Sequence, residues 1–130
     1  MAFLFYLGLG ILFSHELDAM LQAEWRLLYI LRAMPDESAM QAFVLLHVPL
    51  FGAIVWMTHH RSQQMQLRFR VAFAAFLVIH AGLHYRLSSH PLYMFTSVLS
   101  QSLIYGGAVV GTLFLLLSLL AYRRELPREA

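Results

Sequence analysis

Histidine and acidic side chains recur within the most apolar parts of this 130-residue sequence. Imidazoles and carboxylates bind metal ions, and they also act as general acids and bases. Because an ionisable side chain is costly at bilayer depth, such a residue indicates a function by default. If the group converges, a bound metal ion is the simplest explanation. Its members are His15, Glu16, Asp18, His47, His80 and His84.

The spacing of these residues predicts how they face one another. His80 and His84 are four residues apart and share a helix face, and His15 and Asp18, three apart, do the same. Glu16 points about 100° away from His15 on a helix, so we interpret it as the general acid or base and not as a ligand. The predicted metal ligands are therefore His15, Asp18, His47, His80 and His84.

The residue types narrow the choice of cofactor. The sequence has no cysteine, which excludes thiolate ligands, and no lysine, which excludes Schiff-base chemistry. Neutral imidazoles with one or two carboxylates suit zinc or iron, as one ion or two. Three protein ligands with an open position would make a catalytic zinc site, whereas more than one carboxylate ligand favours iron, including a pair of irons. The choice between zinc and iron stays open at this point.

Four membrane-spanning helices must position these side chains. The sequence is 60% hydrophobic and only 12% charged, which is typical of a multi-pass membrane protein. A span needs about 20 apolar residues. We therefore predict an all-α fold, an integral membrane four-helix bundle, formed by a single domain over residues 1–130. The expected spans cover residues 2–21, 39–58, 67–87 and 92–122.

The segment between the first two spans, residues 22–33, is amphipathic. It sets Trp25 and Tyr29 against charged residues, and Trp and Tyr prefer the membrane interface. The pattern predicts an interfacial helix, or the protruding end of a long first helix. We interpret Glu24 and Arg26 as part of an interfacial charge pattern.

An even number of crossings brings the polar residues to one depth. At about 1.5 Å per residue, all four histidines of the group fall in the leaflet away from the termini, within roughly two helical turns. The fourth span enters the same leaflet with Ser97, Gln101 and Tyr105, spaced i, i+4, i+8 on one face. These three residues are predicted to bind and orient the substrate.

The distribution of arginine predicts the orientation. Three arginines lie on the side of the predicted site, and by the positive-inside rule the richer side is cytoplasmic. Both termini are therefore expected in the cytoplasm, most simply at a bacterial inner membrane. Clustering at membrane boundaries also argues against a nucleic-acid partner. The arginines on the terminal side are Arg61, Arg68, Arg70, Arg123, Arg124 and Arg128.

A small-residue motif lies in the fourth span. Gly107 and Gly111 are four residues apart, a spacing that lets helices approach closely. The motif predicts close helix packing within the bilayer, and it is also a candidate interface for a homodimer.

Residues 15–19 read His-Glu-Leu-Asp-Ala and are followed by Glu24 and Trp25, with His-Val-Pro at residues 47–49. This pattern resembles the signature of a small uncharacterised bacterial family of multi-pass membrane proteins. The resemblance covers roughly the first half of the chain. It implies that the polar group on the first helix is a family feature, and it supplies no known reaction.

Three functions are compatible with these residues. The leading hypothesis is a membrane-embedded metalloenzyme, a hydrolase or oxidoreductase, that acts on a lipidic or small apolar substrate in the outer leaflet with Glu16 as acid or base. One alternative is a haem-binding electron carrier with His47 opposite His80 or His84 as axial ligands. The other is a metal or proton transporter component, or an accessory subunit, against which the nearly apolar inner leaflet argues.

Overall fold

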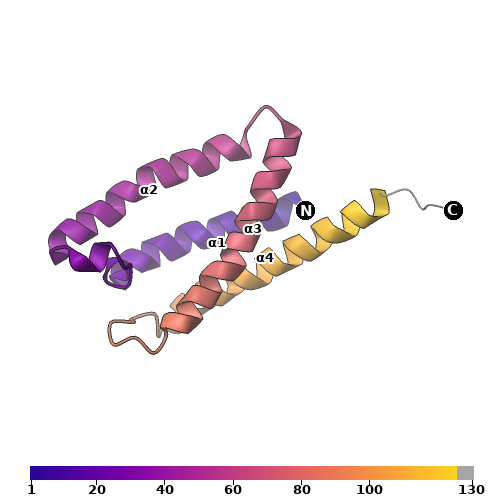
Figure 1. Ribbon diagram of the computed structural model, residues 1–130. Coiled ribbons are helices and arrows are strands. Elements are labelled where there is room, and N and C mark those ends of the chain that lie inside the picture. Colours follow the sequence, from indigo (N-terminus) through magenta and orange to yellow (C-terminus); the bar gives the residue numbers. More distant parts are fainter. Residues whose placement is uncertain (126–130) are drawn as a thin grey trace.

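The computed structural model describes residues 1–125, which form four long helices and no strand (Figure 1). The predicted all-α four-helix fold is thereby confirmed. Arg128, one of the arginines counted above, lies outside the described residues. The helices are α1 (Ala2–Leu21), α2 (Asp36–Thr58), α3 (Gln63–Leu87) and α4 (Val98–Glu125), and two 3-10 turns, η1 (Glu24–Arg26) and η2 (Leu31–Ala33), lie between α1 and α2.

Each of the four helices is long and apolar enough to cross a membrane, as expected for a multi-pass membrane protein. Three of them begin at different residues from those predicted: α2 begins three residues earlier, and serine caps set the N-termini of α3 and α4. Ser62 Oγ accepts a hydrogen bond from the backbone N–H of Met65, and α3 starts directly after it. Ser97 Oγ accepts one from Ser100 N–H in the same way, so α4 begins at residue 98 and residues 88–97 form a loop.

The predicted interfacial helix at 22–33 is not formed as one helix. Ala23 takes the left-handed conformation (φ 53°, ψ 47°) and turns the chain directly after α1. Trp25 is buried and donates a hydrogen bond from Nε1 to Asp36 Oδ1 at 3.0 Å, and Arg26 donates two to the same carboxylate at 2.7 Å each. Because these contacts tie the segment to the start of α2, it folds back onto the end of the bundle as two short turns.

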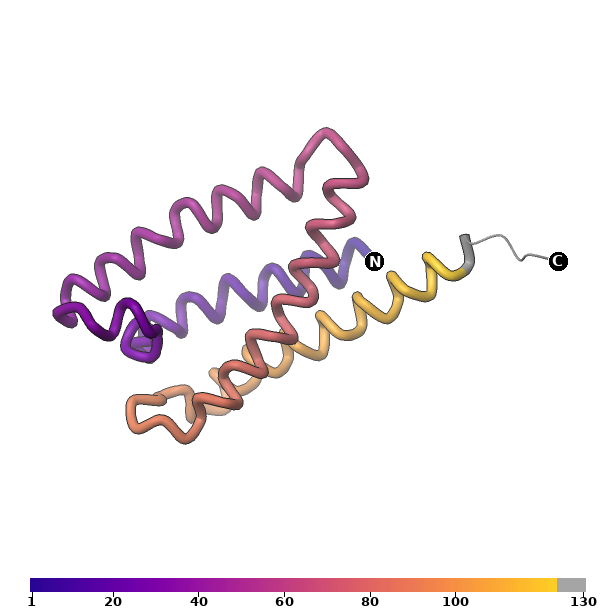
Figure 2. The backbone as a smooth tube through the Cα atoms, in the orientation of Figure 1, coloured from indigo at the N-terminus to yellow at the C-terminus, as the bar shows by residue number. Residues whose placement is uncertain are grey.

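The helices pack unequally. α4 packs along both α1 and α3, whereas α2 packs against α3 and the two 3-10 turns and stands apart from α4 (Figure 2). A Cβ added at Gly111 would lie 2.6 Å from the carbonyl oxygen of Ala74, and one at Gly107 would lie 3.4 Å from Ile11 on α1. The small-residue motif therefore serves packing within the chain, and the homodimer stays a prediction.

Two apolar clusters divide the molecule along its length. The cluster near the N-terminus interlocks aromatic and aliphatic side chains of all four helices, and we call this half the apolar half: Phe5, Leu12, Ile54, Phe73, Leu77 and Phe114. The second cluster surrounds the end of α1, η1 and the 88–97 loop, and we call this half the site half: Ala19, Trp25, Phe43, Ala81, Phe95 and Ile104. The polar residues predicted to do chemistry lie in the site half.

Candidate metal centre

Three histidines and a glutamate converge from α1, η1 and α3. The ligand atoms of His15, Glu24, His80 and His84 all lie within 4.8 Å of one another, and the group could hold a metal ion. His15 and His84 are almost fully buried, at 2% and 3% exposure. The three histidines are among the ligands predicted from the sequence, whereas Glu24 is not.

Helix geometry places the imidazoles. His80 and His84 follow each other by one turn of α3, and their rings stack at 4.7 Å with 5° between the planes. His15, on α1, presents its ring edge-on to both, at centroid distances of 4.7 and 5.0 Å. The packing of α1 beside α3 therefore brings three ring edges to one point.

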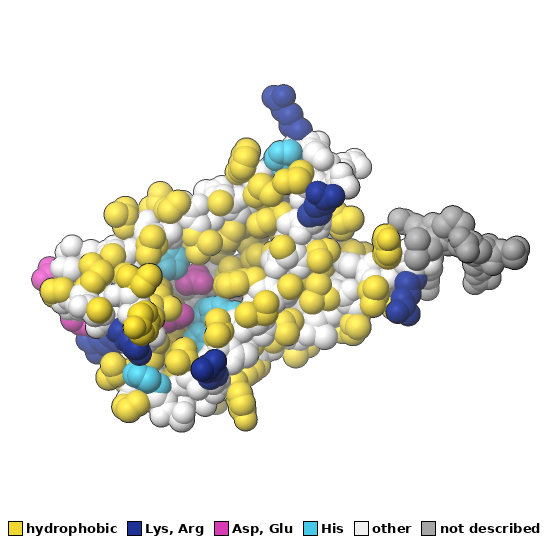
Figure 3. Space-filling view, in the orientation of Figure 1, with side chains coloured by type: hydrophobic (Ala, Val, Ile, Leu, Met, Phe, Trp, Pro, Cys, Tyr) yellow, Lys and Arg dark blue, Asp and Glu magenta, His cyan; other side chains and the backbone are white. Residues whose placement is uncertain are grey.

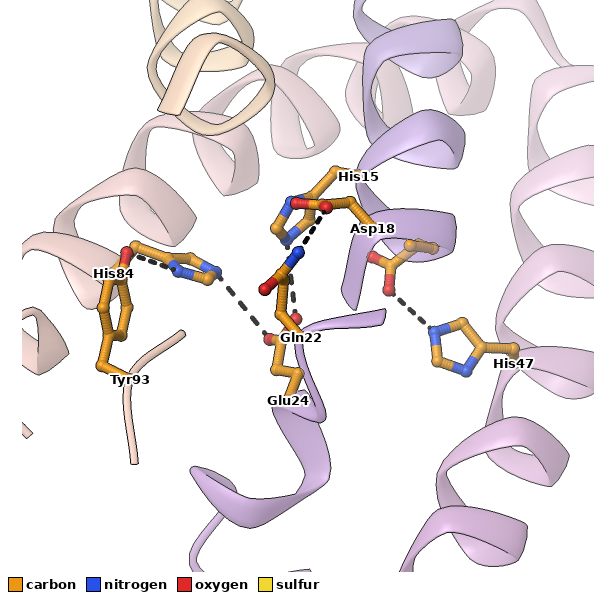
Figure 4. Close-up of polar contacts among 8 residues, drawn as sticks. His15, Asp18, Gln22, Glu24, His47, His84 and Tyr93 are labelled. Atoms are coloured by element: carbon orange, nitrogen blue, oxygen red, sulfur yellow. Dashed lines mark hydrogen bonds and ion pairs between the residues drawn. The ribbon is translucent and has the colours of Figure 1, made fainter. Parts of the chain in front are cut away.

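Glu24 completes the group from a loop and not from a helix. The left-handed turn at Ala23 and the burial of Trp25 direct the Glu24 side chain inward, where Figure 4 shows it pointing between His15 and His84. Its Oε2 lies 3.6 Å from His15 Nε2, and its Oε1 lies 3.8 Å from His84 Nε2. Both distances are too long for hydrogen bonds, but they approach the separation of about 3.3 Å between ligands of a tetrahedral zinc ion.

Several ligand atoms are buried without a hydrogen-bond partner among the described residues. They are both ring nitrogens of His15, Nε2 of His80 and Oε2 of Glu24. Leaving such a group unpaired costs about 1–3 kcal/mol each. A cation at the centre of the group would bind one nitrogen of each histidine and an oxygen of Glu24, so the residues fit a bound metal.

Burial, together with the nearby carboxylates of Glu16 and Asp18, raises the pKa of Glu24 to about 8. The carboxylate form of Glu24 is therefore disfavoured by the protein alone. A cation between Glu24 and the histidines would counter this effect, because it stabilises the charged form.

The 88–97 loop supports the centre from behind. Tyr93 Oη lies 3.3 Å from His84 Nδ1, and the Phe95 ring packs against those of His15 and His84 at 5.5 and 4.7 Å. If Nδ1 of His84 donates to Tyr93, its Nε2 keeps a free lone pair toward the group, the arrangement that metal-binding histidines require. Burial raises the pKa of Tyr93 to about 12.

His47, predicted as a ligand, lies outside the group. Its Nε2 contacts Glu16 Oε2 at 2.8 Å, and its Nδ1 contacts the carbonyl oxygen of Phe43 at 2.7 Å. Both ring nitrogens thus have partners. Glu16, the predicted acid or base, is paired with His47 across the gap between α1 and α2 (Figure 4).

Asp18 also lies outside the group, although it is 4% exposed and close by. Its Oδ1 accepts a hydrogen bond from Gln22 Nε2 at 3.0 Å, whereas its Oδ2 has no partner among the described residues. In its present position Asp18 adds negative charge behind His15 and Glu24 and does not reach the ligand atoms.

The residues predicted to orient substrate lie at the end of the 88–97 loop and in the first turns of α4. Ser97 caps α4 and shares a hydrogen bond with Ser100, and Gln101 donates from Nε2 to the carbonyl of Phe95. Tyr105 is 37% exposed. None of Ser97, Gln101 and Tyr105 lines the pocket described next, and the Gln101 contact helps to hold the loop that carries Phe95.

A pocket of about 440 Å³ opens beside the group, between α2 and α3. Figure 3 shows histidine and acidic side chains at the bottom of a hollow that hydrophobic side chains surround. The polar lining residues are Glu16, Glu24, His47, His80 and His84, and most of the remaining lining is leucine and phenylalanine. The pocket therefore brings the candidate metal group and the Glu16–His47 pair into one cavity.

Fold and site together define a class: a small four-span membrane protein whose histidines and glutamate could hold a metal ion beside an apolar pocket. The chain belongs to the DUF6713 family, a family of unknown function, whose model matches residues 1–121. Searches among curated proteins and among solved structures gave no significant match. The family match agrees with the resemblance to an uncharacterised family.

Proposed function

We propose that this protein is a membrane-embedded metalloenzyme that acts on a lipidic or small apolar substrate. The observation that carries the proposal is the set of unpaired, buried ligand atoms beside an apolar pocket. A purely structural role would not explain why His15, His80 and Glu24 each bring an unpaired atom to this group, because each buried atom adds an unfavourable desolvation free energy.

The ligand set supports a single zinc ion held by His15, Glu24, His80 and His84. One carboxylate with three imidazoles suits zinc, whereas a two-iron centre uses several carboxylates. When three of these residues hold the ion and one coordination position is left to water or substrate, zinc would supply Lewis-acid chemistry, which suits hydrolysis of an ester or amide. Iron in the same ligand set would instead support an oxidoreductase.

The Glu16–His47 pair supplies the acid and base. A backbone carbonyl can only accept a hydrogen bond, so the His47 Nδ1 that contacts Phe43 must carry a proton. One further proton lies in the 2.8 Å contact between His47 Nε2 and Glu16 Oε2, on either partner. The pair thus holds a movable proton at the pocket wall, as general acid–base catalysis requires.

The haem alternative is weaker, because neither ring nitrogen of His47 is free to act as an axial ligand. The transporter alternative is also weaker. Aromatic and aliphatic side chains fill the apolar half, and a pathway for ions or protons needs polar groups through both leaflets.

Metal analysis of the detergent-purified protein tests the proposal. We expect about one zinc per chain, lost in the double variant His80→Ala/His84→Ala and retained in the control His59→Ala/His60→Ala, whose histidines lie at the other membrane boundary. Circular dichroism checks that both variants stay helical. A helical wild type that contains no metal after purification and incubation with zinc would overturn the proposal.

A second variant separates binding from catalysis. Glu16→Gln is expected to keep the zinc and to lower hydrolysis of a small chromogenic ester, nitrophenyl butyrate, by about 100-fold or more. Unchanged hydrolysis in this variant would remove Glu16 from the proposed chemistry. Oxygen uptake by iron-loaded protein, without ester hydrolysis by the zinc form, would replace the hydrolase by an oxidoreductase.

We also propose that both termini lie in the cytoplasm of a bacterial cell, which puts the candidate centre in the outer leaflet. The proposal rests on the arginine distribution. Since the sequence has no cysteine, single variants can be labelled with a membrane-impermeant maleimide. Ser89→Cys should react in intact cells, and Gln64→Cys only after permeabilisation, whereas the reverse pattern would contradict the orientation.

A further inference from the structure

The pocket beside the candidate metal centre is elongated along the helices. Its α2 lining extends from Phe43 to Leu50, about 10 Å at the helical rise, and its α3 lining extends from Phe76 to Leu87, about 16 Å. Because both helices cross the membrane, the pocket runs roughly along the bilayer normal. Lipid hydrocarbon chains lie in the same direction.

The mouth of the pocket faces the surroundings of the bundle between α2 and α3. Leu50, Phe76 and Leu83 line the pocket and are nevertheless 44%, 44% and 53% exposed. Exposed leucine and phenylalanine within two spans are in contact with lipid. A molecule dissolved in the bilayer can therefore enter sideways, without passing through water.

The polar end of the pocket lies below the membrane surface. Glu16, which lines the pocket, comes five residues before the end of α1 at Leu21, so it lies about 7.5 Å inside the helix end. Charged headgroups stay at the interface because burial of a charge is costly. The group that reaches Glu24 and the Glu16–His47 pair must consequently be uncharged.

The residues that line the pocket also indicate an uncharged ligand. Among the described residues, the lining includes two acids and no arginine. A phosphate group needs several donors for its oxygens, and these come from arginine, lysine or backbone N–H groups. Apart from the polar cluster and Tyr29, only leucine and phenylalanine are present, so the lining offers a phosphate group no arginine or lysine partner.

We infer that the substrate of this site is an uncharged, single-chain ester or amide, admitted from the bilayer between α2 and α3. This inference rests on the proposed function for the reaction, although not for binding. The carbonyl group would lie against the polar cluster, and the hydrocarbon chain would follow Leu50 and Phe76 toward the middle of the membrane. A volume of about 440 Å³ is at the low end of the range for ligand pockets, which favours one chain over two.

Photocrosslinking of the full-length protein in phosphatidylcholine nanodiscs tests the inference. The probe is methyl palmitate with a diazirine on its chain, and the comparison probes are the free acid and a phosphatidylcholine with the same chain. We expect saturable labelling by the ester at Leu46, Leu50, Phe76 and Leu83, competed by unlabelled methyl palmitate. The other two probes should label the outer surface without saturation.

A matched pair of variants tests whether the substrate enters the pocket between α2 and α3. Leu83→Trp narrows the mouth and should lower ester labelling at least fivefold, whereas Ile79→Trp, one turn away on α3 and outside the pocket lining, should leave it unchanged. Equal labelling in the two variants, or stronger pocket labelling by phosphatidylcholine or the free acid, would overturn the inference.

The result is independent of the metal. Zinc-free wild type, prepared with a chelator, should keep ester labelling, because the apolar lining is intact. A protein that binds zinc and does not label contradicts the substrate class alone. A protein that labels and binds no zinc contradicts the proposed metalloenzyme and leaves the lipid pocket standing.

Discussion

The apolar half of this molecule is closely packed, whereas the site half contains a pocket and buried polar atoms without partners. In the apolar half, Phe5 contacts Phe73 edge-to-face at 5.4 Å, and Gly8 and Gly111 allow the helices to approach closely. In the site half, α2 and α3 leave a pocket of about 440 Å³ between them. Among the described residues, five of the six buried side-chain atoms without a partner also lie in the site half, the exception being Nε of Arg70.

The two halves have different roles: the apolar half stabilises the fold, and the site half holds the candidate functional groups. Close packing of α1, α3 and α4 in the apolar half holds the bundle together through dispersion and small-residue contacts, which drive helix association in lipid. Because this packing stabilises the bundle, the site half can keep buried polar side chains without hydrogen-bond partners in position, although they destabilise the fold. A bound ion would remove much of that cost, so the two halves should respond differently to metal and to mutation.

The largest effect is expected from metal removal. A chelator should lower the thermal transition of the zinc-loaded wild type in detergent, since a ligand at a thousand times its Kd stabilises a fold by about 4 kcal/mol. Glu24→Gln removes one ligand and should abolish most of this shift. Glu37→Gln, an exposed residue at the start of α2, is the matched control. If chelation leaves the wild-type transition unchanged, the site half needs no ion for its stability.

The second prediction breaks the apolar half instead. Gly111→Ala places a Cβ 2.6 Å from the Ala74 carbonyl and forces α3 and α4 apart, with a cost of about 3 kcal/mol. Gly106→Ala, with nothing within 4 Å, should be neutral or slightly stabilising. Unfolding in detergent measures both. Equal stability of the two variants would mean that the tight contact contributes nothing to the fold.

The part of the candidate site that lies on helices could be predicted from the sequence. The convergence of His15, His80 and His84 could be predicted, because helical spacing and the number of crossings determine depth and face. Glu24 was assigned to an interfacial charge pattern, since its approach depends on a left-handed turn at Ala23 that no periodicity signals. The Glu-Trp element in the resembled signature is the one signal that marked it.

The other differences between prediction and structure also arise from features that helical periodicity does not signal. Depth alone cannot tell a ligand from a hydrogen-bonding partner, so His47 was grouped with the ligands although Glu16 and Phe43 engage both its nitrogens. The later start of α4 could have been anticipated from Ser97 as a cap. The separation of α2 from α4 could not, because it depends on tertiary packing.

A third prediction concerns the support of the centre. Tyr93→Phe removes the hydrogen-bond partner of His84 Nδ1 at 3.3 Å, so the ring can turn and its Nε2 is no longer held toward Glu24. Zinc affinity should fall about 10-fold, the lower end of the effect seen when partners of metal-binding histidines are lost. Tyr122→Phe, exposed near the other end of α4, should bind zinc as the wild type does. Competition with a fluorescent chelator measures both, and equal affinities would assign Tyr93 to packing alone.

The smallest expected effect tests the backbone that carries Glu24. Ala23 is the only non-glycine residue with positive φ in the described chain, and it lies in the site half, directly before Glu24. A left-handed conformation costs an ordinary residue about 1 kcal/mol, which glycine avoids. Ala23→Gly should therefore stabilise the protein by about 0.5 kcal/mol, whereas Ala33→Gly, in η2 with ordinary backbone angles, should destabilise it by a similar amount.

The sign of the change in unfolding free energy in these two variants shows which contacts compensate the backbone strain at Ala23. If Ala23→Gly is stabilising in both the zinc-loaded and the metal-free protein, the turn is strained in either state, and the contacts of Trp25 and Arg26 with Asp36 hold it. If the gain appears only without zinc, the ion itself holds the turn through Glu24. Destabilisation by Ala23→Gly in both states would show that the left-handed turn carries no strain, and the site half would then owe its cost to side chains alone.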